Sequence, residues 1–277
     1  MNIGFIGQGF IGKNYADDFE SRGYSIIRYA LEEPFRQNKD KIAECDIVFI
    51  AVPTPTTPEG FDVSIVQSAL DLVEKGKIAV IKSTILPGTT KVLQKSNQQF
   101  TLLFSPEFLS EATAAYDAAH PFSNIVGLPV DDEAHRSAAS EVHKILPKAP
   151  FVLTCDSDEA EIIKYTHNIS GYTQIVTFNL MYEMARTLGH GWENIGKAIA
   201  VDPLVCRRYA NPVHKSGRGA GGHCFIKDFA AFTDLYEKRV GDESGTKALR
   251  AFEEKNKKLL NESKKDGDLL EGVYGKE

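Results

Sequence analysis

The chain has 277 residues, of which 42% are hydrophobic and 25% charged, and its formal net charge is −6. These values are typical of a globular protein with one large or two modest domains, and lysine and arginine form no block that would favour nucleic-acid binding. No apolar run reaches membrane-spanning length and the N-terminus carries no signal-peptide pattern, so we expect a cytoplasmic protein without a membrane or nucleic-acid partner.

The four cysteines, Cys45, Cys155, Cys206 and Cys224, are widely spaced. None belongs to a C-x-x-C pair, and no histidine pair has the spacing of a zinc site, so we predict no metal site. A cytoplasmic chain keeps its thiols reduced, so we expect no disulfide either. Cys45 and Cys155 are interpreted as buried thiols.

A strand, a glycine-rich turn, a helix and a second strand follow one another at the start of the chain. The apolar run at 2–6 leads into GQGFIG, which places Gly7, Gly9 and Gly12 in G-x-G-x-x-G spacing, and an amphipathic stretch extends to about Ser21. Glycines at these positions let backbone N–H groups approach a pyrophosphate at the helix N-terminus. Because the motif lies in the context that it requires, we interpret it as a dinucleotide site rather than a turn that serves packing alone.

The second strand lacks an acidic residue at its end. An aspartate or glutamate is typical there because it binds the hydroxyl groups of the adenosine ribose, and this position holds Ala30. Glu32 and Glu33 follow closely, and either could bind the ribose. Arg28 or Arg36 could instead accommodate a 2′-phosphate. We favour NAD as the cofactor.

Three further apolar segments, at 45–52, 77–84 and 100–107, continue the strand pattern. They are apolar without alternation, as strands of a parallel sheet covered on both faces are. Helical stretches at about 62–74 and 88–97 lie between them. The first half of the chain is therefore predicted to be a doubly wound parallel sheet.

Each of these strands ends in small polar residues. In open α/β sheets, ligands bind beyond the carboxyl ends of the strands, so we expect these polar residues to converge on one edge. The candidates are Thr54, Thr84, Glu107 and Glu111. Thr84 could alternatively serve as a helix N-cap.

The second half of the chain is predicted to be mainly helical. Asp156, Ser157 and Asp158 are suited to cap a helix, and a pattern without proline then runs from about residue 160 to 188. We therefore predict an α/β protein with a Rossmann-like, dinucleotide-binding domain at 1–155 and a helical domain at 156–277, joined by this long helix.

Lys164 and Asn168 lie four residues apart on the long helix and so share a face. A lysine and an amide placed together could stabilise an oxygen that gains negative charge during a reaction. On a helix, such a pair is more often a solvated surface feature, and these two residues alone do not decide between the alternatives.

The stretch RGAGGHCFIKD, at 218–228, joins a glycine loop to an amphipathic helix. Its glycines make the loop compact and could let backbone amides face a ligand or Cys224. Cys224 stands near the start of the helix beside His223 and Lys227, a setting that favours the thiolate. Asp228 lies on the same helical face, where it could orient a water molecule or hold a proton. These residues alone leave a nucleophile and a buried thiol equally open.

The segment GGHCFIKD resembles the cysteine motif of the UDP-glucose/GDP-mannose dehydrogenases, GG-x-C-F-P-K-D. In chain order, KSTILPGTT, SPEFLSEATA and AEIIKYTHN resemble that family's S-T…P-G-T, N-P-E-F-L-x-E-G-x-A and A-E-x-x-K-Y-x-x-N segments. TFNLMYEMARTLG and ALRAFEEKNKKL resemble the later parts of its central domain. The resemblance spans about residues 1–262, and its ordered motifs favour the nucleophile over the buried thiol.

The resemblance implies an NAD-dependent, four-electron oxidation of the primary alcohol of a nucleotide sugar, such as UDP-glucose, to a uronic acid. Cys224 would attack the intermediate aldehyde to form a thiohemiacetal, and its oxidation would give a thioester that water hydrolyses. Lys164 and Asn168 would stabilise oxyanions, and the remaining catalytic residues would organise the water and its proton. The catalytic set is Cys224, Lys164, Asn168, Asp228, Thr84 and Glu111.

The resemblance also implies which residues bind the substrate and the cofactor. The substrate set is Glu107, Phe108, Leu109, Arg208 and Gly221. The cofactor set is Gly7, Gly9, Phe10, Ile11, Gly12, Glu32, Val52, Pro53, Thr54, Thr84 and Lys227. Because Arg208 falls where the family carries an arginine that reaches a partner subunit's site, we expect a homodimer through the long helix.

Several positions depart from the family pattern. Ile226 stands for a proline, Asn124 for an arginine and Ala112 for a glycine. The chain ends in a charged tail at 264–277, where the family has a further C-terminal domain that closes over the nucleotide. We therefore expect part of the nucleotide-binding surface to be missing. A two-electron hydroxyacid-type dehydrogenase and a non-catalytic NAD-binding subunit stay open as alternatives.

Overall fold

The computed structural model describes residues 1–215 and 217–276. They form two compact units, and the division falls inside the long helix α6 (Ser157–Thr187), a little beyond the domain boundary predicted at 155/156. Unit 1 comprises Met1–Thr54 and Asp62–Lys164, and unit 2 comprises Pro55–Phe61 and Tyr165–Glu277.

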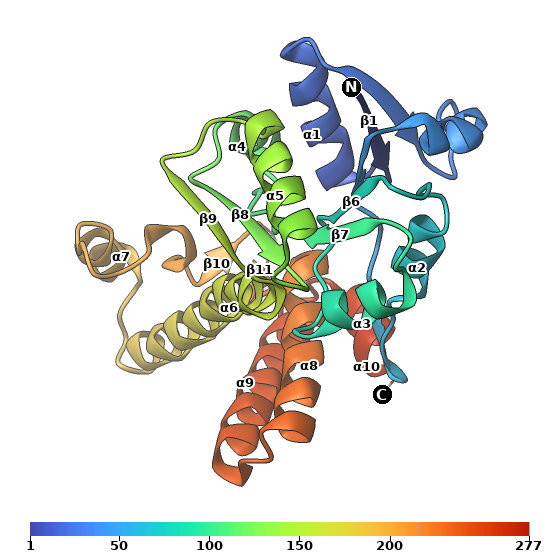
Figure 1. Cartoon of the computed structure of the whole chain (residues 1–277). Helices are drawn as coiled ribbons and strands as arrows, with labels where there is room; N and C mark the ends of the chain where they lie inside the picture. The colour runs from blue at the N-terminus through green and yellow to red at the C-terminus, as the bar shows by residue number, and fades with distance from the viewer. Residues whose placement is uncertain (216, 277) are drawn as a thin grey trace. The chain divides into compact units, whose positions relative to one another are not determined.

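Unit 1 is built around a seven-stranded sheet (Figure 1). In spatial order its strands are β2 (Ser25–Tyr29), β1 (Asn2–Ile6), β3 (Ile47–Ile50), β6 (Ile78–Ile81), β7 (Thr101–Phe104), β8 (Ser123–Leu128) and β9 (Phe151–Asp156). Neighbouring strands pair in parallel except β7 and β8, which are antiparallel. The predicted α/β class is confirmed, with one antiparallel pair in a sheet that was expected to be parallel.

Helices cover both faces of this sheet. On one face, α1 (Phe10–Ser21), α4 (Ala114–Ala119) and α5 (Glu133–Ile145) share a core with alternate strand residues, in which Phe5 stacks on Phe49 at 5.0 Å. Successive side chains of a strand point to opposite faces, so the remaining strand residues face the other way. There, α2 (Ser64–Leu70) and α3 (Thr89–Ser96) contact β3 and β7, and the 3-10 helix η1 (Arg36–Glu44) contacts β2.

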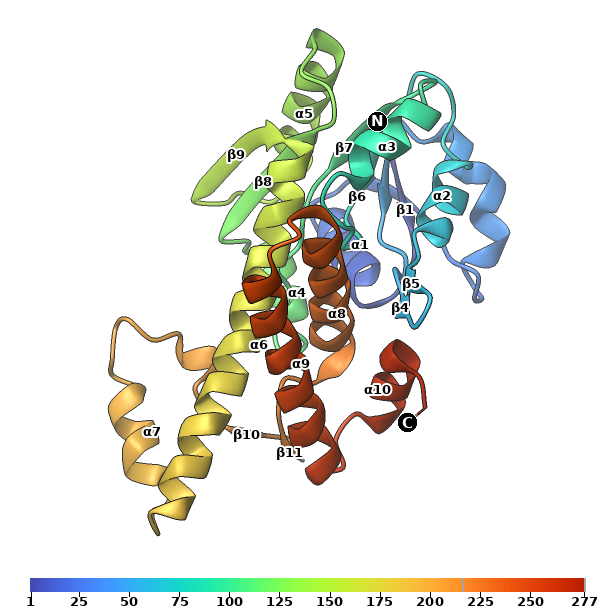
Figure 2. The same cartoon turned by 90° about the horizontal axis from the view of Figure 1, so that it is seen from below.

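Unit 2 is mainly helical, and its long helices α8 and α9 lie side by side (Figures 1 and 2). Its core includes Tyr172 of α6 stacked on Phe229 of α8 at 3.8 Å. The helices that follow α6 are α7 (Glu193–Ile199), η2 (Arg207–Tyr209), α8 (Gly222–Arg239), α9 (Glu243–Glu262) and α10 (Gly267–Tyr274). Two short hairpins complete it, β4 (Thr56–Thr57) with β5 (Gly60–Phe61) and β10 (Val213–His214) with β11 (Gly217–Arg218).

The C-terminal segment, expected to be a charged tail, instead forms helix α10. Leu270 is buried, and Leu269, Val273 and Tyr274 pack with it against Ile226 of α8 and the end of α9. These apolar residues recur one turn apart, which gives the segment one apolar face despite its charged composition. The expectation was wrong because overall charge conceals this short periodic pattern.

The first turns of α6 are held to the start of α3 by a buried carboxylate. Glu161 accepts hydrogen bonds from the backbone N–H groups of Gly88 and Thr90, at 2.6 and 2.9 Å, and from the Thr90 hydroxyl at 2.6 Å. Glu161 and Thr90 are fully buried. The carboxylate thus satisfies amides that a helix N-terminus leaves without intrahelical partners.

Glu161→Ala should lower the free energy of unfolding by about 2–3 kcal/mol, because it leaves several buried donors without an acceptor. The exposed Glu133→Ala is the matched control and should change it by less than about 0.5 kcal/mol. Urea denaturation of both variants measures the difference, and equal stabilities would contradict a structural role for Glu161.

Candidate functional site

The glycine turn between β1 and α1 is shaped by two of its three glycines. At Gly7 the backbone has a φ of +91°, and a Cβ there would lie 2.3 Å from the carbonyl oxygen that follows β3. At Gly12 a Cβ would lie 1.9 Å from the Gly7 carbonyl oxygen, whereas at Gly9 it would meet no atom within 4 Å. Phe10 and Ile11 begin α1 beside this open position. The turn therefore has the free backbone surface that a pyrophosphate requires.

The segment around the end of β2 carries the charged side chains predicted to bind the adenosine ribose or its 2′-phosphate. The strand ends at Tyr29, Ala30 is buried, and Glu32 is exposed two residues further on. The Arg28 guanidinium pairs with two carboxylates of α1 at 2.7 Å each. Arg36 is exposed at the start of η1. Because Arg28 is already neutralised by these carboxylates, it is poorly suited to bind a 2′-phosphate.

The carboxyl ends of β3 and β6 are hydrogen-bonded to one another. The Val52 N–H donates to Ser83 Oγ at 2.9 Å, and that hydroxyl donates to the Val52 carbonyl oxygen at 2.7 Å. Beyond Pro53, the Thr54 hydroxyl donates to the Thr84 carbonyl oxygen at 2.7 Å. The alternative of Thr84 as a helix N-cap is wrong, because α3 begins further along the chain and follows a glycine.

A buried ion pair links the segment after β7 to α6. Lys164 Nζ lies 3.0 Å from Glu107 Oε1 and donates to the Glu107 carbonyl oxygen at 2.7 Å. Glu107 Oε2 accepts from the Leu109 N–H at 2.8 Å, and the Phe108 ring lies 5.4 Å from the ammonium. Glu111 is exposed in the turn before α4. Both charges of the pair are thus fixed in position by several contacts.

Lys82, a second buried lysine, lies near this pair. Its ammonium contacts the Ser105 carbonyl and hydroxyl oxygens at 3.3 and 3.2 Å and lies 4.3 Å from the centre of the Tyr15 ring. Burial lowers its pKa to about 7, against a partial rise from the charge of Glu107. Lys82 was not among the residues predicted from the sequence, although a lysine near the end of the apolar run KIAVIKST is a signal that could have identified it.

In unit 2, Cys224 is exposed at the third position of α8. The loop before it is held by side chains from α9 and the α9–α10 turn, each of which binds one loop residue. Arg218 N–H donates to Ser263 Oγ (3.0 Å), Lys265 Nζ to the Gly219 carbonyl oxygen (3.0 Å), Ala220 N–H to Asn256 Oδ1 (2.7 Å) and Gly222 N–H to Asp266 Oδ2 (2.7 Å). The loop is therefore held along its length.

The glycines of this loop allow those close contacts. A Cβ at Gly217 would lie 2.6 Å from Ser263 Oγ, and one at Gly221 would lie 2.0 Å from Asp266 Oδ2. Gly219 has a φ of +90°. Three loop N–H groups donate to the chain's own side chains. For those three, the expectation that loop amides face a ligand or the cysteine is wrong.

Asp228 lies one turn beyond Cys224 on α8, and each of its carboxylate oxygens contacts another side chain. Asn168 of α6 donates to its Oδ2 at 2.6 Å, and Lys227 Nζ lies 2.6 Å from its Oδ1. Asp228 and Asn168 are buried, whereas Cys224 is exposed. Asn168 is thus a buried partner of a carboxylate rather than a solvated surface residue.

Helix η2 packs against α6 next to the start of α8. A Cβ at Gly171 would lie 2.9 Å from ring atoms of both Tyr209 and Phe225, so this glycine is needed for the close approach. Arg208 is exposed on η2. The second half of α6 carries exposed apolar side chains, among them Met181 and Met184. The homodimer through this helix stays a prediction.

The residues predicted from the sequence thus fall into two sets, one in each unit. Unit 1 holds Gly7, Gly9, Phe10, Ile11, Gly12, Glu32, Val52, Pro53, Thr54, Thr84, Glu107, Phe108, Leu109, Glu111 and Lys164. Unit 2 holds Asn168, Arg208, Gly221, Cys224, Lys227 and Asp228.

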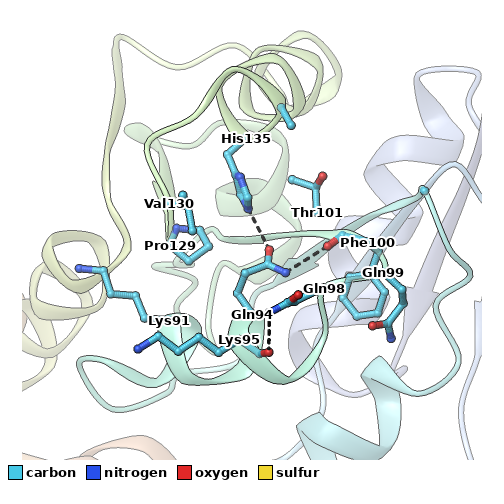
Figure 3. Close-up of a pocket in the computed structure, with 12 residues that line it drawn as sticks. Lys91, Gln94, Lys95, Gln98, Gln99, Phe100, Thr101, Pro129, Val130 and His135 are labelled. Atoms are coloured by element: carbon cyan, nitrogen blue, oxygen red, sulfur yellow. Dashed lines mark hydrogen bonds between the residues drawn. The ribbon is translucent and has the colours of Figure 1, made fainter.

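A cavity of about 460 Å³ in unit 1 contains none of the predicted residues (Figure 3). It lies at the amino ends of β6 and β7, the edge of the sheet opposite the glycine turn, and α3 and α5 line it. His135 Nε2 is 2.9 Å from Gln94 Oε1, and Gln94 Nε2 donates to the Phe100 carbonyl oxygen at 3.1 Å (Figure 3). These polar groups bind one another, which indicates a structural role.

Among residues 1–215 and 217–276, no helix combines the length and apolar character needed to cross a membrane. Within the same ranges, no three histidine, cysteine, aspartate or glutamate side chains are grouped so that they could hold a metal ion.

Comparisons with known proteins match both units. The model for the UDP-glucose/GDP-mannose dehydrogenase family, NAD binding domain, matches residues 30–147, and the model for the central domain of that family matches residues 158–258. The Bacillus subtilis protein YtcA is 30% identical over 205 residues, which cover 70% of this chain and 46% of YtcA. This chain therefore matches about half the length of that relative.

Two longer matches carry dehydrogenase names. The UDP-glucose 6-dehydrogenase of Rickettsia conorii is 27% identical over 314 residues, which cover 98% of this chain and 70% of that protein. The structure of a UDP-glucose dehydrogenase from Pyrobaculum islandicum matches with a TM-score of 0.78 at 26% identity, covering 91% of this chain and 68% of the other. NAD is thus the cofactor that the first unit is built to bind.

Gly9→Ala and Gly12→Ala should separate cofactor binding from folding. A Cβ at Gly12 meets a backbone oxygen, so Gly12→Ala should lower the free energy of unfolding by about 1–3 kcal/mol and weaken NAD binding. Gly9→Ala should keep the stability within about 0.5 kcal/mol and still lower NAD affinity at least about tenfold. Thermal melts and calorimetric titration measure both, with Gly191→Ala as the control that should change neither.

Lys82→Met should flatten the pH dependence of stability. The pKa of Lys82 is lowered to about 7 in the folded chain and is about 10.5 in the unfolded chain. Between these values the unfolded state binds one more proton, so wild-type stability should rise with pH, by up to about 1.4 kcal/mol per unit. Urea denaturation at several pH values should show this rise for wild type and for Lys95→Met, but not for Lys82→Met.

Proposed function

Since the chain belongs to the UDP-glucose/GDP-mannose dehydrogenase family, we propose that it is an NAD-dependent nucleotide-sugar 6-dehydrogenase with a UDP-glucose-like substrate. The observation that carries this proposal is the position of Cys224. It is an exposed thiol in the first turn of α8, one turn before a buried, doubly bound carboxylate at Asp228. An accessible thiol in this setting suits attack on a carbonyl carbon.

The proposed reaction converts a primary alcohol, two NAD⁺ and one water into a carboxylate, two NADH and three protons. Each bound NAD⁺ accepts one hydride from the carbon that is oxidised. Between the two oxidations, the Cys224 thiolate adds to the aldehyde carbon and forms a C–S bond. The second hydride leaves this thiohemiacetal to give a thioester, and water breaks the C–S bond and releases the thiol.

In unit 2, the contacts of Asp228 define its proposed role. Asn168 and Lys227 bind separate oxygens of its carboxylate, so the side chain keeps one orientation. A carboxylate held in this way can orient the hydrolytic water and accept its proton. We propose that Asn168 also donates to oxyanions along the path, and that Arg208 and Gly221 contact the substrate.

In unit 1, Lys164 is proposed to stabilise negative charge on a substrate oxygen. Its ammonium is held by the side chain and the carbonyl oxygen of Glu107, and a preorganised cation stabilises a developing charge without reorganising. Glu107, Phe108 and Leu109 are proposed to hold the sugar. Thr84 and Glu111 are proposed to organise water.

The cofactor fits the glycine turn of unit 1. The open position at Gly9 and the start of α1 suit the pyrophosphate, and Glu32 is the proposed partner of the ribose hydroxyls. The carboxyl edge formed by Val52, Pro53 and Thr54 extends this surface. We propose NAD rather than NADP because Arg28 is paired with carboxylates of α1 and is therefore poorly suited to bind the 2′-phosphate of NADP.

The proposal is tested by counting the hydrides released. Purified protein is incubated with NAD and each of several UDP-, GDP- and ADP-sugars, and NADH and the sugar acid are measured together. We expect two NADH per acid, and we expect Cys224→Ser to lower acid formation at least about 10³-fold. Cys206→Ser, which alters another exposed thiol, should keep wild-type activity.

Each alternative predicts a different result. One NADH per product, with full activity in Cys224→Ala, would support a two-electron dehydrogenase and overturn the four-electron reaction. NAD binding without turnover on any sugar nucleotide would support a non-catalytic subunit. A covalent adduct on Cys224, detected by mass spectrometry after incubation with substrate, would support the nucleophile directly.

A further inference from the structure

Two residues of opposite charge on the α9–α10 turn contact the loop that carries Cys224. Lys265 is 7% exposed, and its ammonium donates to the carbonyl oxygen of Gly219 at 3.0 Å. The neighbouring Asp266 accepts the N–H of Gly222, the first residue of α8, at 2.7 Å. Neither residue belongs to the motifs by which the chain resembles its family.

Asp266 takes the place of a helix cap that α8 lacks. The N-cap position of α8 is Gly221, which has no side chain to accept a hydrogen bond from the first turn. The Asp266 carboxylate reaches this position from another element, and only a glycine leaves room for it, because a Cβ at Gly221 would lie 2.0 Å from Asp266 Oδ2. The cap and the glycine therefore form one arrangement.

Helix α10 holds the turn in place. Leu270 is buried against Ile226 of α8 and Leu260 of α9, and the Tyr274 hydroxyl donates to Glu253 of α9 at 3.1 Å. Asp266 itself has a φ of +55°, a left-handed conformation that non-glycine residues seldom adopt. Packing on both sides thus fixes a turn whose backbone would otherwise favour another shape.

The two charges act on Cys224 with opposite signs. A carboxylate at the start of α8 offsets the positive end of the helix dipole and disfavours a thiolate two residues further on, whereas the Lys265 ammonium favours it. Burial lowers the pKa of Lys265, and the charge of Asp266 partly offsets this. In the first two turns of α8 the other titratable groups are His223, Lys227 and Asp228, while Tyr209 packs against Phe225 and Lys215 lies near Lys265.

We propose that Lys265 and Asp266 are positioning residues for Cys224, which hold its loop and set, with opposite signs, how readily its thiol ionises. The catalytic meaning of this assignment rests on the proposed function. The arrangement itself does not, because thiol ionisation can be measured without substrate or cofactor.

The test measures the rate at which iodoacetamide alkylates Cys224 in the full chain, over roughly pH 6 to 10. Peptide mass spectrometry separates Cys224 from Cys206, which is exposed and serves as an internal reference. Asp266→Asn keeps an oxygen for the Gly222 N–H but removes the charge. The pH at which Cys224 alkylation reaches half its maximal rate, its midpoint, should therefore fall by roughly half a pH unit. Lys265→Met should raise it by a similar amount.

The opposite directions distinguish this role from general loosening of the loop, which would move both variants the same way. Asp268→Asn is the matched control, because it removes an exposed charge from the next helix, and it should keep the wild-type midpoint. Unchanged midpoints, or shifts of the same sign, would overturn the proposal. If Asp266→Asn does not fold, Lys265→Met still tests the proposal by itself. If the two midpoints shift as expected but the chain turns over no sugar nucleotide, only the proposed function is overturned.

Discussion

The contact between the glycine loop at 217–222 and the end of α9 determines where Cys224 lies. A glycine such as Gly221 has no Cβ, so the Asp266 carboxylate can reach the first backbone N–H of α8. An alanine at this position would displace that contact and the start of the helix with it. The exposed thiol is therefore positioned by packing within unit 2 as much as by its own helix.

A similar dependence on close backbone approach operates in unit 1. Gly12 lies against the Gly7 carbonyl oxygen, so the turn before α1 is compact without help from side chains. Charged groups surround the segment that follows β7, which contains Glu107. Glu107 is bound to Lys164, and Lys82 lies buried nearby with its pKa lowered to about 7, so the positive charge around this carboxylate varies with pH near neutrality.

The elements that could be predicted from the sequence are those that depend on local pattern. The apolar strands and the long helix α6 follow from periodicity, and the glycine turn follows from spacing in a βαβ context. Helix α10 was missed because the charged composition of its segment conceals the short apolar period of Leu269, Leu270 and Val273. The contacts of Lys265, Asp266 and Lys82 were missed for a different reason, since each binds a residue distant in sequence.

Cys224 and Asp228, which lie one turn apart on α8, differ in burial. A nucleophile must reach a substrate carbon, and the thiol is exposed at the third position of α8. A group that orients water must keep one direction, and the Asp228 carboxylate is 1% exposed with both oxygens bound. One helical turn therefore separates an accessible thiol from an immobile carboxylate. The exposure of Cys224 is not what a cysteine packed into the core of unit 2 would show.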